Sequence, residues 1–227
     1  MARTLNPAAH TVKREAFVEA AQRLIQTRGY EQMSVQDVLD EIEASRGAFY
    51  HYFDSKEALL EAVVDRMMDA GLGAVTPFVD DPHLSALRKF ESVFAGIQSF
   101  KAERKPLVLA LLEVWISDHN AVVREKFRRT GVTRLVPMLS AIIRQGNAEG
   151  SFDSGAPDEA ARVVVGMLQS FSDVAIELFL ARQANTIGFE DVERAVAANT
   201  MACERILGLR AGSLTLIDGP ALRFWFG

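Results

Sequence analysis

The chain is poor in the residues that form metal clusters and covalent cross-links. It contains one cysteine, Cys203, and four histidines among its 227 residues. A single cysteine forms no internal disulfide, and no histidine lies in a spacing typical of metal ligands. The sequence also lacks a Gly-rich phosphate loop and a nucleophile elbow. These absences argue against an enzyme, and we expect no metal, no cofactor and no catalytic residue.

Long hydrophobic runs and an excess of basic charge are lacking as well. No uninterrupted apolar run reaches the ~18 residues of a membrane-spanning helix, and residues 1–11 show no apolar segment of a signal peptide. The 25 Lys and Arg are outnumbered by 30 Asp and Glu, which gives a net charge of −5. Such a charge argues against a protein that coats nucleic acid. We expect a cytoplasmic protein without a membrane partner.

A nucleic-acid surface on such a chain must be local, and the N-terminus offers one. The basic candidates Arg3, His10, Lys13 and Arg14 all precede the first acidic residue, Glu15. The four histidines themselves fall on different predicted elements, at positions 10, 51, 83 and 119.

Hydrophobic periodicity predicts helices along nearly the whole chain and no strand. Capping residues and breakers divide the pattern, among them Gly29 after the first helix and Ser34 before the second. Gly71 and Pro77 predict an end to the fourth helix. The fold class is therefore all-α, with about nine helices, at residues 12–28, 34–42, 45–52, 57–69, 84–100, 106–118, 121–149, 157–183 and 189–209. An irregular tail follows at 210–227.

The most informative stretch is Ser34–Lys56, SVQDVLDEIEASRGAFYHYFDSK. Two short helices joined by a tight turn form a helix-turn-helix unit, whose second helix enters the major groove of DNA. On that helix Arg46 can pair with a guanine edge or a phosphate, and Ala48 can contact a thymine methyl group. Tyr50 and His51 can donate hydrogen bonds to phosphates.

A lysine at the start of the fourth helix adds to this pattern. Lys56 lies where the helix dipole disfavours a cation, which suits a site for a phosphate. The alternative is a helical hairpin inside a larger bundle, which explains the aromatic residues but not Arg46, Gly47 and His51. The predicted DNA-binding residues are Lys13, Ser34, Ser45, Arg46, Gly47, Ala48, Tyr50, His51 and Lys56.

At these residues the chain resembles a known family. The string ASRGAFYHYFDSKEALLEAV is similar to the signature of TetR-type (tetracycline-repressor-like) regulators, and TRGYEQMSVQDV resembles that family's link between its first two helices. A weaker similarity lies in AIIRQGNAEGSFDSGAPDEAARVVVGML. The chain departs from the family at Leu39, Ile42, Glu43 and Ala44. If the turn requires a positive φ, Glu43 in place of the usual glycine costs about 1 kcal/mol.

The resemblance implies a DNA-binding domain at residues 1–56 and a helical body at 57–227 that binds a ligand and dimerises. Large apolar residues predict an apolar pocket, with candidates Phe90, Phe94, Trp115, His119, Met138, Met167 and Phe171. The eighth and ninth helices are apolar on more than one face, which favours a four-helix bundle across a two-fold axis. The candidate interface residues are Val164, Leu168, Val192, Val196 and Thr200.

The expected function is a regulator that binds a near-palindromic operator as a homodimer. We expect repression that is released by a hydrophobic small molecule. The alternatives are an activator, a regulator without a ligand, or a helical adaptor that binds other proteins. Within the body, Glu113 and His119 could share a pocket, but a solvated carboxylate and a histidine at a helix end are the simpler interpretation.

Overall fold

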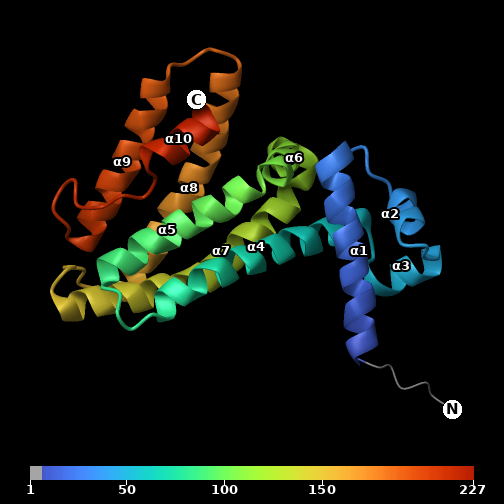
Figure 1. Ribbon diagram of the computed structural model, residues 1–227, viewed down its shortest axis with the longest axis horizontal. Helices are drawn as coiled ribbons and strands as arrows, with labels where there is room; N and C mark the ends of the chain where they lie inside the picture. The colour runs from blue at the N-terminus through green and yellow to red at the C-terminus, as the bar shows by residue number, and fades with distance from the viewer. Residues whose placement is uncertain (1–6) are drawn as a thin grey trace. The chain divides into compact units, whose positions relative to one another are not determined.

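The computed structural model describes residues 7–227, which form ten α-helices and one 3₁₀ helix and contain no strand (Figure 1). The predicted all-α class is confirmed. The helices are α1 (Pro7–Arg28), α2 (Val35–Glu41), α3 (Arg46–Tyr52), α4 (Lys56–Asp80), α5 (Ala86–Glu103), α6 (Lys105–Ile116), η1 (Asp118–Asn120), α7 (Ala121–Glu149), α8 (Pro157–Gln183), α9 (Phe189–Leu207) and α10 (Gly219–Phe226). Arg3 lies outside the described residues.

The chain packs as two compact units. The head unit runs to Asp69 and also includes Arg104–Phe127, and the body unit comprises Ala70–Glu103 and Arg128–Gly227. The division falls inside α4 and α7. These two units are therefore defined by packing. The predicted boundary after residue 56 instead separates a DNA-binding domain from a body that binds a ligand and dimerises, and it stays a prediction.

The head unit is built around aromatic residues of α1 and α3. Phe17 and Phe49 are fully buried, and their ring centroids lie 5.8 Å apart. Helix α6 packs on α1 and contributes Leu107 and Val114 to the same core. Ion pairs tie further helices together: Arg66 of α4 lies 2.9 Å from Glu19 of α1. The start of α7 is held in the same way, because Lys126 lies 2.6 Å from Glu61 of α4.

The body unit has a core formed by α5, α7, α8 and α9, with the end of α4 added through Val75. Helices α8 and α9 run side by side, and α10 packs against both (Figure 1). Cys203 of α9 is fully buried. Burial raises the pKa of the Cys203 thiol to about 12, so it stays protonated and acts as a core residue.

Helix α1 begins at Pro7, earlier than the expected residue 12, and two larger differences from the predicted elements follow. Helix α4 was expected to end near residue 69 but continues to Asp80, with Pro77 inside it. Burial of Val75 holds this last part of the helix, although Pro77 cannot donate a backbone hydrogen bond. The tail was expected to be irregular, but it contains α10, which is capped by Asp218 and anchored by the buried Leu222.

Candidate nucleic-acid interface

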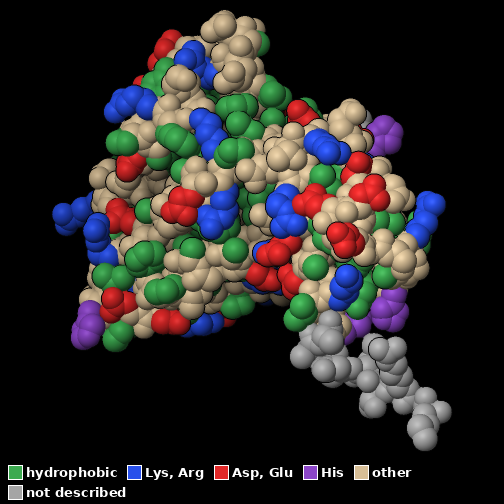
Figure 2. All heavy atoms as spheres, turned by 45° about the vertical axis from the view of Figure 1, so that its right-hand side comes forward, with side chains coloured by type: hydrophobic (Ala, Val, Ile, Leu, Met, Phe, Trp, Pro, Cys, Tyr) green, Lys and Arg blue, Asp and Glu red, His purple; other side chains and the backbone are tan. Residues whose placement is uncertain are grey.

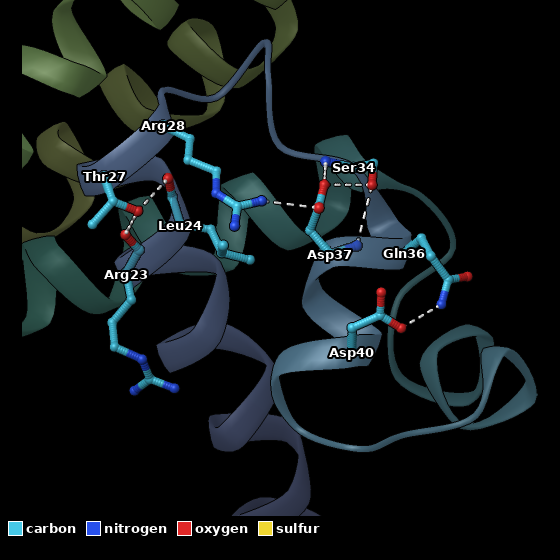
Figure 3. A network of polar contacts seen from close by, with 8 residues as sticks. All are labelled: Arg23, Leu24, Thr27, Arg28, Ser34, Gln36, Asp37 and Asp40. Carbon is cyan, nitrogen blue, oxygen red and sulfur yellow. Dashed lines mark hydrogen bonds and ion pairs between the residues drawn. The ribbon is translucent and has the colours of Figure 1, made fainter.

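The start of α2 is fixed by a reciprocal cap at Ser34. The Ser34 hydroxyl accepts a hydrogen bond from the Asp37 amide at 3.1 Å, and the Asp37 carboxylate accepts one from the Ser34 amide at 2.8 Å. Figure 3 shows Arg28 reaching from α1 to the same carboxylate, at 3.0 Å. The hydrogen bonds from Ser34 hold the pKa of Asp37 below its usual range. This network attaches α2 to the end of α1.

The turn between α2 and α3 is closed by its own backbone and by Ser45. The Ala44 amide donates to the Leu39 carbonyl at 2.9 Å, and the Ser45 hydroxyl accepts from the Ala48 amide at 3.2 Å. Ser34 and Ser45, both predicted to bind DNA, are therefore exposed residues that cap α2 and α3. A capping hydroxyl has further lone pairs, but contact with DNA stays a prediction for both.

Helix α3 presents a polar face to solvent and an aromatic face to the core. Arg46, Gly47, Tyr50 and His51 are exposed, and Ala48 is half-buried. Phe49 is fully buried beneath them. The structure thus places the predicted recognition residues together on one exposed helix, while their contacts with DNA remain a prediction.

Basic residues from α1 and α4 accompany this helix in the head unit. The Lys13 ammonium lies 6.0 Å from the ring centroid of Phe17, and the Arg14 guanidinium lies 5.2 Å from that of Phe53. Lys56 is the first residue of α4, and its ammonium lies 4.2 Å from the Tyr30 ring and donates to the Glu31 carbonyl at 3.4 Å. Lys56 is therefore positioned by protein contacts at the helix start rather than free in solvent.

Glu43 adopts a left-handed backbone conformation, with φ of 49°. This is the conformation that glycine adopts without steric cost. We expect Glu43→Gly to stabilise the protein by about 0.5–1 kcal/mol and to raise its melting temperature by about 1–4 °C. Thermal unfolding followed by circular dichroism measures the change. Glu43→Ala is the control, because it removes the carboxylate but keeps a Cβ; equal stabilisation by both variants would contradict a backbone origin.

The predicted ligand residues are divided between the two units. Trp115 and His119 belong to the head unit, whereas Phe90, Phe94, Met138, Met167 and Phe171 belong to the body unit. Phe90 is fully buried and packs on Phe94 and Phe152, which is the environment of a core residue. His119 is exposed. Trp115 packs edge-on against Phe127, and its indole N–H is buried with no hydrogen-bond partner among the described residues.

Two open hollows among the described residues lie elsewhere, along the tail. One, of about 710 Å³, lies between α5 and residues 215–225. The other, of about 440 Å³, lies between α9 and residues 212–222. None of the seven predicted ligand residues lines either hollow.

The predicted dimer residues lie on α8 and α9, but several of them are buried within the single chain. Val164 and Val192 are fully buried, Val196 is 8% exposed, and Leu168 and Thr200 are partly buried. Helix α10 explains the burial on α9, because Leu222 packs with Val192 and Val196. A charge at Val196 would therefore disturb the protomer's own core, and a test of the interface needs an exposed position.

Helix α8 nevertheless exposes much apolar surface. An 18-residue window of it has a mean hydropathy of 1.6, and only 11% of that window is buried. By length and composition it could span a membrane, which the sequence analysis did not expect. The core helix of a soluble protein has the same composition. Exposed apolar side chains include Val163 and Val174 of α8 and Met201 of α9.

One contact in the head unit was not foreseen. His10 of α1 and His51 of α3 meet with ring centroids 5.6 Å apart, although the sequence places them on separate elements. Nothing in the spacing of residues 10 and 51 indicates this pair, because it depends on how α1 crosses α3.

The chain is similar in sequence to known bacterial regulators. Residues 17–63 match the model of "Bacterial regulatory proteins, tetR family". The HTH-type transcriptional regulator EthR of Mycolicibacterium smegmatis is 30% identical over 141 residues, covering 55% of this chain and 65% of that protein. The aligned region thus spans just under two thirds of this relative. The HTH-type transcriptional repressor DhaR of a Mycobacterium species is 26% identical, covering 71% of this chain and 81% of that protein.

Solved structures support the same fold. A TetR transcription regulator from Haloarcula marismortui superimposes with a TM-score of 0.62 over 87% of this chain and 97% of its own, at 20% identity. At that identity the likeness concerns the fold. Together with the described helices, it agrees with a helix-turn-helix head followed by a helical body.

Proposed function

We propose that the chain is a member of the TetR family of bacterial regulatory proteins, whose model its residues 17–63 match. On this premise it is a cytoplasmic repressor that binds a near-palindromic operator as a homodimer and leaves it when an apolar small molecule binds. The observation that carries the proposal is the exposed face of α3 within the matched segment. The relative named a repressor supports repression over activation. Relatives of this kind are regulators, which argues against an enzyme.

Arg46 and Lys56 are assigned different parts in binding. Arg46 is exposed at the start of α3, where an arginine can read a base edge, whereas Lys56 is held at the start of α4, where it meets a phosphate. We expect Arg46→Ala to change the preferred operator sequence. We expect Lys56→Ala to weaken binding to all duplexes alike and to lower the salt slope by about one.

Selection of bound duplexes from a random library, followed by titration at several salt concentrations, measures both effects. A near-palindrome should emerge from the wild-type selection, since a symmetric dimer reads two half-sites. Lys56→Ala with unchanged affinity and salt slope would contradict its contact with phosphate. A wild-type protein that selects no duplex would contradict the proposed function and favour an adaptor.

The dimer in this proposal uses the exposed faces of α8 and α9. Their exposed apolar residues are accompanied by small ones, Gly166 and Ser170 on α8 and Ala197 and Ala198 on α9. Small residues let helices of two protomers approach closely, and a two-fold interface uses the same patch on both subunits. This arrangement supports a four-helix bundle made of two helices from each subunit.

The effector is proposed to be apolar with a hydrogen-bond acceptor that reaches Trp115. Among the described residues, the indole N–H of Trp115 is buried without an acceptor, and an unsatisfied buried donor costs about 1–3 kcal/mol. A bound acceptor would remove that cost. The proposal concerns Trp115 rather than Phe90, whose side chain is enclosed in the body core.

We expect Trp115→Phe to weaken effector binding about tenfold and to leave operator binding unchanged, because phenylalanine keeps an aromatic ring and lacks the N–H. The chain has two tryptophans, so Trp225→Phe makes the fluorescence specific to Trp115. In that background, apolar metabolites that release bound DNA should also change the emission. Release without any change in Trp115 emission, or equal release from Trp115→Phe, would contradict this assignment.

A further inference from the structure

The pair formed by His10 and His51 is connected to the exposed face of α3 by a third ring. Both imidazoles pack on Tyr52, with centroid distances of 4.6 Å from His10 and 5.0 Å from His51. His51 is exposed and His10 is half-buried, so the two rings lie at the surface beside the predicted recognition residues. In Figure 2, histidine side chains (purple) gather at the lower right next to a Lys or Arg side chain. Imidazole nitrogens can donate hydrogen bonds to the oxygens of a phosphate.

The protein itself offers these imidazoles little negative charge. Among the described side chains, no carboxylate oxygen lies within 4.0 Å of a ring nitrogen of His10 or His51. On α1, Glu15 pairs with Arg14 and Arg66, and Glu19 pairs with Arg66 of α4. Glu113 of α6 lies near Gly29, at the opposite end of α1.

The charged residues that accompany the pair on α1 and α3 include several cations. Lys13 and Arg14 follow His10 on α1, and Arg46 begins α3, while the acids that flank α3, Glu43 and Asp54, lie outside the helix. His10 also lies in the first turn of α1, where the helix dipole disfavours a positive charge.

We propose that His10 and His51 together clasp a DNA phosphate and take up protons when the operator binds. A phosphate beside the two rings favours the imidazolium form of each, so the complex holds more protons than the free protein. Binding that takes up protons becomes stronger as the pH falls. His10 is thereby a DNA-binding residue, and operator affinity depends on pH in the range where histidine changes charge. This inference rests on the proposed function.

The test measures affinity for the duplex selected from a random library, at pH values from about 6 to about 7.5, with a chelator present. Over this range we expect the wild-type affinity to fall about 10- to 100-fold as the pH rises, and that of the His10→Gln/His51→Gln variant to change less than about threefold. Each single variant should lose about half of the pH dependence on a logarithmic scale. The wild-type salt slope should be steeper at the lower pH, because more cationic groups then displace counterions.

A matched control and a direct readout complete the experiment. His83 is exposed in the body unit, and His83→Gln should keep the full pH dependence of the wild type. Nuclear magnetic resonance of the imidazoles should show His10 and His51 protonated at higher pH in the complex than in the free protein. Equal pH dependence in the wild type and the double variant would overturn the inference while leaving the proposed function intact. A wild type that binds no duplex at any pH would overturn both.

Discussion

A protein in which Gly166 is replaced by arginine is expected to fold normally, to be monomeric and to lose operator binding. Gly166 is exposed on α8, and a Cβ built at this position meets no other atom within 4 Å. The side chain therefore fits the single chain without strain. An arginine in the middle of a helix is also favoured over glycine by about 0.5–1 kcal/mol.

The dimer is affected differently, because a large charged side chain separates the helices that are proposed to meet across the two-fold axis. A monomer contacts one half-site, and the operator affinity should fall at least about 100-fold. Sedimentation gives the oligomeric state, and binding to the selected duplex gives the affinity. Gly166→Ala is the control, since a methyl group should preserve the dimer. A stable Gly166→Arg dimer with wild-type affinity would show that this face of α8 is not the interface.

The second large effect is expected at Gly208, which ends α9 with a left-handed φ of 67°. The loop after α7 crosses the helix at this point, where the Asp153 amide donates to the Leu207 carbonyl at 2.9 Å. A Cβ at Gly208 would lie 2.7 Å from the Asp153 carbonyl oxygen, which belongs to the backbone and cannot rotate away. We expect Gly208→Ala to cost about 2–4 kcal/mol and to lower the melting temperature by about 5–15 °C.

Gly212 provides the matched comparison for this substitution. Its φ is 78°, but a Cβ there meets nothing within 4 Å. Gly212→Ala should therefore show the conformational cost alone, about 1 kcal/mol. The difference between the two variants, measured by denaturant unfolding, isolates the contact with Asp153. Equal losses at both positions would show that this contact contributes nothing.

The sequence was sufficient for the helix-turn-helix because its signals are local. Ser34 caps α2 as its position predicted, and Ser45 caps α3 in the same way. Phe49 is buried while Tyr50 is exposed, as helical periodicity requires. Even the positive φ of Glu43 follows from the tightness of the turn between the two helices. Each of these features depends on residues within a few positions of one another.

Features that depend on distant residues could not be predicted in the same way. The glycines and the proline near the end of α4 are ordinary helix breakers, but packing of Val75 and Val79 on the body core favours the helix beyond them. Val196 has the pattern of an interface residue, but Leu222 of the tail covers it. The contact of His10 with His51 similarly requires the crossing of α1 and α3.

The presence of α6 and the start of α7 in the head unit has a consequence for synthesis on the ribosome. Residues up to Asp69 leave the ribosome first, but Leu107, Val114 and Val123, which close the same core, emerge later. At about 5–20 residues per second, the stretch from residue 69 to residue 127 takes about 3–12 s to translate. During that interval the nascent helix-turn-helix exposes apolar surface that the finished protein covers. A fusion that carries the first 69 residues alone would keep that surface exposed permanently.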